Sequence, residues 1–290
     1  MTKIACIGEA MIELSMDGNT AQVGVAGDTL NTAIYLRREA PALHVDYVTC
    51  LGDDAFSYRI KDFIQSHNIG TTKIEMIEGA SPGLYAISTT EEGERSFSYW
   101  RSAAAARRMF QKGAGCDFDL LAEYDAIYVS GITMAILPQS VRLALIDWLA
   151  KSDITFIYDS NYRPKLWDSV ENAQMITRAM WARADIALPS IDDEMELFNE
   201  DAVQVVDRFA NHHGIGALKQ GDAGPISIGE DVSQIYAAAS KVVDTTAAGD
   251  SFNGGYLAAY LSESTQAKAL RAGHDCAAKV VQFRGAIIPE

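Results

Sequence analysis

Positively charged side chains are scarce in this sequence. Its 290 residues include 24 Lys and Arg against 39 Asp and Glu, which gives a formal net charge of −15. A general nucleic-acid binder needs a basic surface to displace counterions from phosphates, and docking on an anionic membrane also needs basic residues. The charge balance therefore argues against both nucleic acid and membrane as partners.

Cysteine is also rare, and its spacing indicates neither a metal site nor a redox site. The nearest two of the four cysteines, Cys6 and Cys50, are 50 − 6 = 44 positions apart. The sequence has no CxxC pair, and its five histidines form no HExxH motif. A metal ion held by His or Cys is therefore not expected.

Long hydrophobic runs are absent as well. The N-terminal residues 1–14 carry one early Lys, and Glu9 interrupts their apolar run, which is unlike a signal peptide. The longest apolar-rich stretch, 127–137, contains Ser130 and Gly131 and is too short to span a bilayer. We expect a soluble, reduced protein of the cytoplasm.

Short apolar runs alternate with longer helical patterns along most of the chain. This alternation predicts an α/β fold with a central, mostly parallel sheet and helices on both of its faces. Ligands of such folds bind beyond the carboxyl ends of the strands. The predicted strands are 3–8, 45–51, 126–130, 154–158, 185–188 and 215–219, and the predicted helices are 28–39, 54–67, 138–150, 248–261 and 266–283.

One region breaks the alternation. Segments 73–78, 83–90 and 94–100 have the pattern of short strands, and 94–100 alternates polar and aromatic residues. We predict a small β lid on an α/β body; the lid comprises 12–24 and 73–106, and the body comprises 1–11, 25–72 and 107–290. Such a lid would exclude water from an active site. The sequence is equally consistent with a β meander that does not move.

The strongest chemical signal is the run 243–255, where small residues lead into a helix with an apolar stripe. Small side chains let backbone amides approach a ligand, and these amides and the helix dipole favour an anion. Asp250 lies in the same turn. An anion cradle beside a carboxylate suits phosphoryl transfer, in which the carboxylate accepts the hydroxyl proton. We expect the helix N-terminus to keep Asp250 ionised, as a weak base. The alternative is an ordinary acidic cap on a Gly-rich turn.

The stretch 244–250, DTTAAGD, resembles the DTxGAGD signature of the PfkB (ribokinase-like) family of sugar kinases. Ala247 stands where the signature usually has Gly, a change that removes no backbone amide. Residues 26–31 (AGDTLN) are similar to the family's Gly-rich sugar motif, and 218–224 (LKQGDAG) to its VKxGxxG nucleotide loop. The motif order fits, and the resemblance covers essentially the whole chain. It implies a ribokinase-like fold.

Within the family, the chain looks most like the members that phosphorylate 2-keto-3-deoxygluconate. The resemblance implies transfer of the ATP γ-phosphoryl group to the terminal hydroxyl of this sugar acid. It rests on the stretches 8–14 (GEAMIEL), 27–31 (GDTLN), 82–85 (PGLY), 93–95 (GER), 99–101 (YWR), 161–167 (NYRPKLW) and 284–289 (RGAIIP).

The resemblance also implies roles for individual residues. Ala247, Ala248 and Gly249 would form the anion hole, with Asp250 as the base. The sugar side would be held by Gly27, Asp28 and Asn31 from the body and by Tyr85, Tyr99 and Arg101 from the lid. Arg163 would reach the substrate or the phosphates, and Lys219, Gly221 and Gly224 would line the nucleotide site.

The two arginines give a separate physical argument about the substrate. Asp, Asn and Gly usually suffice to hold a neutral sugar, whereas Arg pairs bidentately with a carboxylate. Arg101 and Arg163 stand at the expected sugar end of a protein with a net charge of −15. Local positive charge there would admit an anionic substrate and ATP, which favours an acid sugar.

The expected metal site departs from the family pattern. Many relatives carry Asn-x-x-Glu near the fifth strand, whereas residues 189–194 are PSIDDE and contain no Asn. Mg²⁺ commonly keeps several waters, which Asp193 with Ser190, or Glu194 alone, could order. The alternative is an acidic first helical turn that complements the helix dipole. Asp244 and Thr246 could offer oxygens to a monovalent cation such as K⁺.

Two other functions stay open from the sequence. One is a family kinase for another sugar, such as fructose, ribose or a nucleoside, and the other is a catalytically silent sensor of sugar acids. The expected partners are a small sugar acid and ATP. We also expect a homo-oligomer, either a dimer through the lid strands or a higher assembly, because exposed sheet edges favour pairing.

Overall fold

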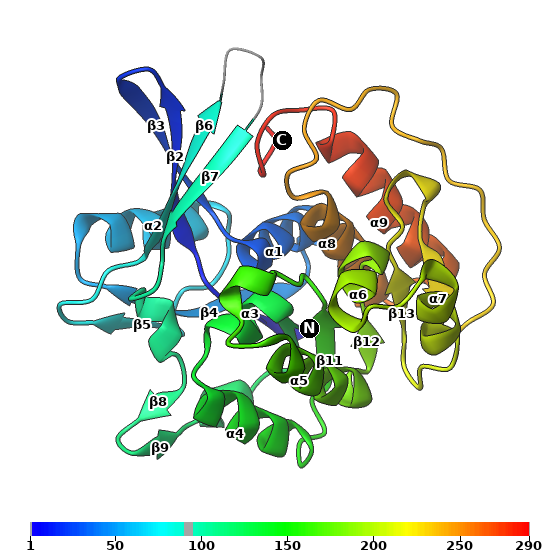
Figure 1. The fold of residues 1–290 in the computed structure, drawn as a ribbon, viewed down its shortest axis with the longest axis horizontal. Coiled ribbons are helices and arrows are strands. Elements are labelled where there is room, and N and C mark those ends of the chain that lie inside the picture. Colours follow the sequence, from blue (N-terminus) through cyan, green and yellow to red (C-terminus); the bar gives the residue numbers. More distant parts are fainter. Residues whose placement is uncertain (1, 90–94, 290) are drawn as a thin grey trace.

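The computed structural model describes residues 2–89 and 95–289, and its largest element is an eight-stranded sheet (Figure 1). The strand order is β14-β13-β12-β11-β10-β1-β4-β5, with all neighbours parallel except the antiparallel pair β13–β14. The strands are β1 (Lys3–Ile7), β4 (His44–Gly52), β5 (Ile74–Ile77), β10 (Ala126–Ser130), β11 (Thr155–Asp159), β12 (Ile186–Ala187), β13 (Ile215–Leu218) and β14 (Ile226–Ile228). The predicted α/β fold is confirmed.

Helices cover both faces of this sheet. They are α1 (Asp28–Glu39), α2 (Ala55–Ser66), α3 (Gly131–Ile136), α4 (Gln139–Leu149), α5 (Val170–Arg183), α6 (Ile191–Phe198), α7 (Ala202–Ala210), α8 (Ala248–Tyr260) and α9 (Gln266–Val280). Short 3-10 turns occur at Ala105–Arg108, Asp119–Leu121, Pro164–Leu166 and Gly221–Ala223, and β8 (Gln111–Lys112) pairs with β9 (Gly115–Cys116). Within the described residues, every helix is too short or too polar to cross a bilayer.

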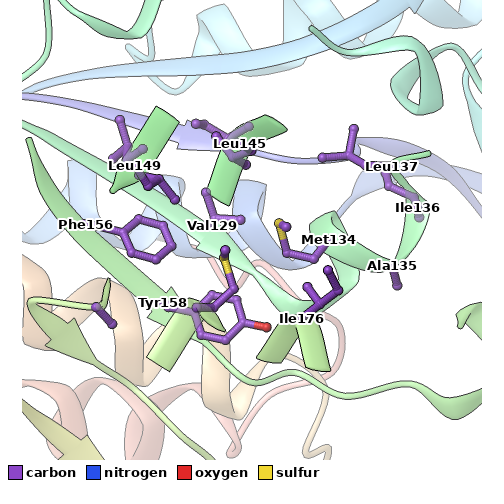
Figure 2. Packing of buried hydrophobic residues seen from close by; sticks show 14 of the residues in the cluster. Val129, Met134, Ala135, Ile136, Leu137, Leu145, Leu149, Phe156, Tyr158 and Ile176 are labelled. Atoms are coloured by element: carbon purple, nitrogen blue, oxygen red, sulfur yellow. The ribbon is translucent and has the colours of Figure 1, made fainter. Parts of the chain in front are cut away.

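The core is divided in two by the sheet, because successive side chains of a strand point to opposite faces. Ile127 and Val129 of β10 belong to a cluster with residues of α3, α4 and α5, as Figure 2 shows for Val129. Ala126 and Tyr128 of the same strand belong to a second cluster with residues of α1, α2, α8 and α9. Strands buried on both faces read as continuous apolar runs, which is why the sequence revealed them.

A four-stranded sheet in the order β3-β2-β6-β7 stands out from this body, at the upper left of Figure 1. It consists of β2 (Met11–Asp17), β3 (Thr20–Ala26), β6 (Gly83–Thr89) and β7 (Arg95–Trp100). Its strands overlap the segments 12–24 and 73–106, whose role as a lid stays a prediction, with one difference. The strand expected at 73–78 is β5, which pairs with β4 at the edge of the large sheet and buries Ile74 in its core. Gly93 and Glu94 belong to the stretch 93–95 on which the family resemblance rests, and Glu94 begins the strand expected at 94–100. Both residues lie outside the described part of the chain.

Two glycines let α8 lie unusually close to its neighbours. A Cβ at Gly254 would come within 2.5 Å of the Tyr35 Cβ on α1, and one at Gly255 within 2.7 Å of the Ala272 carbonyl on α9. Real Cβ atoms do not tolerate such contacts, so side chains here would push the helices apart. The first turn of α8 is thereby held against the first turn of α1.

The core packing predicts different costs for two leucines of α4. Leu145 is fully buried, whereas Leu143 is 45% exposed. We expect Leu145→Ala to lower the free energy of unfolding by about 3 kcal/mol, because it leaves a cavity against β10, and Leu143→Ala to lower it by less than about 1 kcal/mol. Urea denaturation followed by circular dichroism measures both values, and equal costs would contradict this packing.

Candidate active site

One large cavity of about 1300 Å³ gathers the predicted site residues between the four-stranded sheet and the carboxyl edge of the body. The motifs it unites lie far apart in the sequence, and their meeting at the strand ends follows the usual placement of ligands in α/β folds. The predicted residues that line it are Gly27, Asp28, Asn31, Tyr85, Tyr99, Arg101, Arg163, Asp193, Lys219, Gly221, Gly224, Ala247, Ala248, Gly249 and Asp250.

The small-residue turn opens α8 at the floor of this cavity. Ala247 caps the helix with φ 60° and ψ 19°, in the left-handed region. A side chain at Gly249 would meet only the Lys219 Nζ, at 3.8 Å from the Cβ position, so the backbone there borders open space. An anion can therefore approach the first amides of α8, which the helix dipole favours.

Asp250 lies in the first turn of α8 and contacts α1. Its Oδ2 accepts a hydrogen bond from the Asn31 Nδ2 at 2.8 Å, and its carbonyl accepts one from the Thr32 hydroxyl at 3.2 Å. Burial in the cavity floor raises the pKa of Asp250 to about 8; the Asp28 carboxylate adds to this effect, whereas the Asn31 hydrogen bond opposes it. The expectation that the helix N-terminus keeps its pKa low is wrong, because burial outweighs the dipole.

The end of the cavity beside Asn31 and Arg101 contains polar atoms that are buried without a partner in the described part of the chain. Among the described residues, the Asn31 Oδ1 and the Arg101 Nε have no hydrogen-bond partner. A buried polar atom costs free energy until it is paired, so both positions suit a ligand. Asn31 offers an acceptor for a hydroxyl, and Arg101 offers a donor for a carboxylate or carbonyl oxygen. Asp28 is held nearby by the Asn161 Nδ2, which donates to its Oδ2 at 2.9 Å.

Arg101 is paired with a carboxylate of the protein itself. Its Nη2 donates to the carboxylate of Glu9, which is fully buried at the end of β1. Burial raises the pKa of Glu9, and the Arg101 guanidinium opposes that rise. Because a guanidinium has five N–H donors, the pair anchors Arg101 and still leaves donors for a substrate.

Aromatic rings from the four-stranded sheet form the roof of the cavity. Tyr85 on β6 stacks on Tyr99 of β7, with ring centroids 5.6 Å apart, and its hydroxyl donates to Glu13 of β2. Phe97 lines the same wall, although the sequence did not single it out. Phe97 and Tyr99 occupy alternate positions of β7, so their rings lie on the same face of the sheet, where they would cover a bound ligand.

The two alternatives for the metal site differ in position, because Asp193 and Ser190 line the cavity and Glu194 does not. Asp193 lines it, and its Oδ1 accepts from the Arg163 Nη1 at 3.4 Å. Glu194 lies outside the lining residues, fully buried, with Arg208 and Trp181 as partners. Neighbouring residues on a helix face different directions, so only one of the pair can point into the cavity. The expectation that Glu194 orders water around a metal ion in this cavity is therefore wrong.

Another wall of the cavity is built by the chain that follows β13. Gly221 has φ 60° and Gly224 has φ 82°, both in the left-handed region. No atom lies within 4 Å of a Cβ built at Gly221, whereas one at Gly224 would strike the Tyr236 ring at 2.6 Å. Gly221 thus leaves room for a ligand, and Gly224 lets the chain pass close to Tyr236.

Sequence reasoning missed three polar residues of the site. Asp159 is the last residue of β11 and Asn161 lies two positions beyond it, and both line the cavity. Asn253 lies on α8, three residues beyond Asp250. A polar residue at the carboxyl end of a buried parallel strand is a signal that could have identified Asp159. Asn253 carries no such signal, because Asn is an ordinary residue within a helix.

The left-handed conformation of Ala247 predicts a gain in stability on its replacement by glycine. A non-glycine residue there costs about 1–2 kcal/mol, part of which Gly returns through a more flexible unfolded chain. We expect Ala247→Gly to raise the free energy of unfolding by about 1 kcal/mol. Ala259→Gly, inside α8, should lower it by about 1 kcal/mol. Urea denaturation compares the two, and a loss of stability in Ala247→Gly would contradict the geometry.

Comparison with known proteins gives agreeing results. A sequence model described as pfkB family carbohydrate kinase matches residues 1–290. The chain is 44% identical to a 2-dehydro-3-deoxygluconokinase of Dickeya dadantii over 301 residues, covering 99% of this chain and 96% of that protein. It is 42% identical to a 2-dehydro-3-deoxygluconokinase of Escherichia coli K12 over 304 residues, covering 99% and 97%.

A solved structure shares the fold. It is that of a PfkB protein from Polaromonas sp. JS666, which superposes with a TM-score of 0.82 at 23% sequence identity, covering 97% of this chain and 96% of that one. This likeness supports the ribokinase-like architecture expected from the motifs. Since the family pattern spans all of its residues and full-length relatives share more than 40% identity, this chain belongs to the pfkB family of carbohydrate kinases.

Proposed function

We propose that this chain catalyses the ATP-dependent phosphorylation of 2-keto-3-deoxy-D-gluconate, also called 2-dehydro-3-deoxy-D-gluconate, at its terminal 6-hydroxyl. The observation that carries the proposal is the position of Asp250, a carboxylate with a pKa of about 8 beside the exposed N-terminus of α8. Relatives with more than 40% identity bear the name of this kinase. The products are ADP and 2-keto-3-deoxy-6-phosphogluconate.

The chemistry follows from the floor of the cavity. The 6-hydroxyl oxygen forms a bond to the γ-phosphorus of ATP, the bond from that phosphorus to the bridging oxygen of ADP breaks, and Asp250 takes the hydroxyl proton. The amides of Ala248 and Gly249 face the transferred group, whose equatorial oxygens carry the charge. A base whose pKa lies near the working pH removes the proton more readily than an ordinary aspartate would.

The substrate's carboxylate and keto end lies toward the lid in this proposal. Arg101 supplies its unpartnered Nε, and Asn31 accepts from a hydroxyl. Arg163 is more than half exposed at the cavity wall and supplies a second guanidinium. Tyr99 covers this end, which keeps out water that would otherwise accept the phosphoryl group.

ATP would lie over the loop after β13, with Gly221 and Gly224 beneath it. Within the described residues, no group of three or more His, Cys, Asp or Glu side chains could hold a metal ion. A Mg²⁺ ion would therefore take most of its ligands from phosphate and water, with Asp193 ordering that water. Bound there, the metal would neutralise charge on the transferred group.

A K⁺ ion would have to share the Asp244 carboxylate with Thr246 and Gly285, which donate to it. We also propose a cytoplasmic location.

A coupled assay of ADP release over a panel of sugar acids and neutral sugars tests the function. We expect turnover with 2-keto-3-deoxygluconate and little with fructose, ribose or nucleosides. Asp250→Asn, which keeps the shape of the side chain, should abolish turnover. Equal turnover of neutral sugars would end the acid-sugar assignment, and the absence of ADP formation with every compound would favour a silent sensor.

The raised pKa of Asp250 predicts the pH dependence of the reaction. The pKa of Asp250 is about 8, so at a pH below this value most of the carboxyl is protonated and cannot accept the hydroxyl proton. We expect kcat/KM for the sugar acid to fall about tenfold or more between pH 9 and pH 6.5. Initial rates at saturating ATP measure the profile, and a flat profile over this range would exclude Asp250 as a base of raised pKa.

Arg163 allows a cleaner test of the acid-sugar end than Arg101 does. Removal of the Arg101 guanidinium would leave Glu9 buried and unpaired, which destabilises the fold itself. Arg163→Ala removes an exposed side chain and should raise KM for the sugar acid about tenfold with little change in stability. Arg59→Ala, on the exposed surface of α2, is the control and should leave KM unchanged. An unchanged KM in Arg163→Ala would remove this residue from the site.

We propose that the outer edge of the lid sheet pairs with a second copy of the chain. β7 forms this edge, and Phe97, Tyr99 and Trp100 on it are each more than 40% exposed. An edge strand with large apolar side chains favours pairing. We expect light scattering to show at least twice the 31.5 kDa of one chain, and Trp100→Lys to reduce this mass. Val203→Lys, at an exposed apolar residue of α7, should not, and a monomer in the wild type would contradict the proposal.

A further inference from the structure

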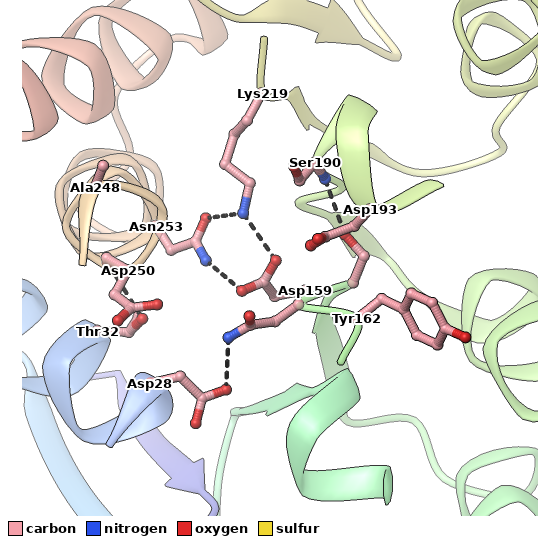
Figure 3. Close-up of polar contacts among 12 residues, drawn as sticks. Asp28, Thr32, Asp159, Tyr162, Ser190, Asp193, Lys219, Ala248, Asp250 and Asn253 are labelled. Carbon is pink, nitrogen blue, oxygen red and sulfur yellow. Dashed lines mark hydrogen bonds and ion pairs between the residues drawn. The ribbon is translucent and has the colours of Figure 1, made fainter. Parts of the chain in front are cut away.

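Lys219 and Asp159, which line the cavity, form a ring of hydrogen bonds with Asn253 (Figure 3). The Lys219 Nζ donates to the Asp159 Oδ1 at 2.8 Å and to the Asn253 Oδ1 at 3.1 Å. The Asn253 Nδ2 donates to the Asp159 Oδ2 at 3.0 Å, and the Tyr128 hydroxyl donates to the same oxygen at 3.2 Å. We call these four residues the Lys219 cluster. They come from the ends of β13 and β11, from α8 and from β10.

The Lys219 cluster holds its side chains rigidly. Asn253 and Tyr128 are fully buried, and the side chains of Asp159 and Lys219 are 3% and 12% exposed. A buried ammonium is costly unless it is paired, and here a carboxylate and an amide oxygen fix its position. These two partners therefore hold the Lys219 ammonium in the wall of the cavity and keep it from turning toward solvent.

The ammonium is fixed beside the reacting end of the cavity. The Lys219 Nζ lies 3.8 Å from the Cβ position at Gly249, in the turn whose amides would hold the transferred group. An ammonium has three N–H donors, and among the described residues two of them are taken by Asp159 and Asn253. The third is available to an oxygen of a phosphoryl group resting on that turn.

We propose that Lys219 is a catalytic residue that contacts the phosphoryl group in transfer, and that Asp159 and Asn253 are positioning residues that hold its ammonium there. The inference rests on the proposed function and adds to it, because the family resemblance assigned Lys219 only to the nucleotide site and assigned no role to Asp159 or Asn253. A charge fixed in advance where negative charge develops stabilises a transition state without reorganisation.

Steady-state kinetics of three variants test the roles. Lys219→Met should lower kcat about 100-fold or more with little change in KM for the sugar acid, because its contact forms in the transition state. Asp159→Asn keeps the shape but removes the charge that anchors Lys219, and it should lower kcat about tenfold or more. Asn253→Ser removes the other anchoring oxygen and should act in the same direction.

The pH profile separates a positioning role from a structural one. The charged groups that face Asp250 are Asp28 from α1, Asp159 from the end of β11 and Lys219 from the end of β13. Asp159 raises the pKa of Asp250 and Lys219 lowers it. The acid limb of kcat/KM should therefore move to lower pH in Asp159→Asn and to higher pH in Lys219→Met. Damage to the fold would not move the limb in opposite directions.

Binding of ADP with aluminium fluoride, a mimic of the transferred group, provides a second readout. In the presence of sugar acid, Lys219→Met should lose tight binding of ADP with fluoride yet bind ADP alone nearly as well as the wild type. Weaker binding of ADP with an unchanged kcat would overturn the proposal and leave Lys219 as a nucleotide contact.

Asp185→Asn is the matched control for Asp159→Asn. Asp185 also pairs with a cation, Arg183 at 2.6 Å, but it does not line the cavity. Its replacement should leave kcat and the pH limb unchanged. If Asp159→Asn and Asn253→Ser both behave like this control, neither residue positions Lys219. If Asp159→Asn does not fold, Asn253→Ser decides alone. Because these comparisons need an active wild type, failure of the proposed function would be visible first.

Discussion

The close approach of α8 to α1 is the constraint on which this site depends. It is possible because Gly254 has no side chain to strike Tyr35. The approach places Asp250 within hydrogen-bonding distance of Asn31, although the two residues are 219 positions apart in the sequence. The proposed base from one motif and the proposed sugar contact from another thus become one unit, and tight packing fixes their separation.

Charge is distributed unevenly around this unit. The chain carries a net charge of −15, and three carboxylates, Asp28, Asp159 and Asp250, lie close enough to affect one another. Burial of Asp250 raises its pKa, the other two carboxylates add to the rise, and Lys219 offsets part of it. Lys219 thus counters negative charge beside the turn that is proposed to hold the phosphoryl group, and the raised pKa would make Asp250 a stronger base.

The four-stranded sheet contributes the complementary constraint. The chain joins it to the body before β2, after β3, before β6 and after β7, and the buried pair of Glu9 and Arg101 links the segment between β1 and β2 to the residue that follows β7. Arg101 is therefore held by the body while it faces the lid side of the cavity. A substrate bound between them would be enclosed by aromatic rings above and by the first turn of α8 below.

The sequence by itself determined the α/β class and most of the strands and helices, and all of the catalytic, substrate and nucleotide residues it predicted line the cavity, whereas Glu194 does not. Buried parallel strands are continuous apolar runs, and the small-residue turn before α8 is recognisable because backbone amides need small side chains to approach an anion. Helices α3 and α7 were not predicted. The six residues of α3 carry too little periodicity to identify a helix, whereas α7 has a capping box at Asp201 and buries Val205 and Phe209 four positions apart, a pattern that could have identified it.

Only the tertiary structure decided which charges are free and which are paired. It assigned Glu194 to Arg208, Glu9 to Arg101 and Lys219 to Asp159. It also placed β5 in the large sheet instead of the lid. Each of these outcomes depends on contacts between residues far apart in the chain, and the pKa of Asp250 depends on burial by several elements at once. Local sequence patterns describe the chain's preferences along its length, whereas pairing and burial arise when distant segments meet.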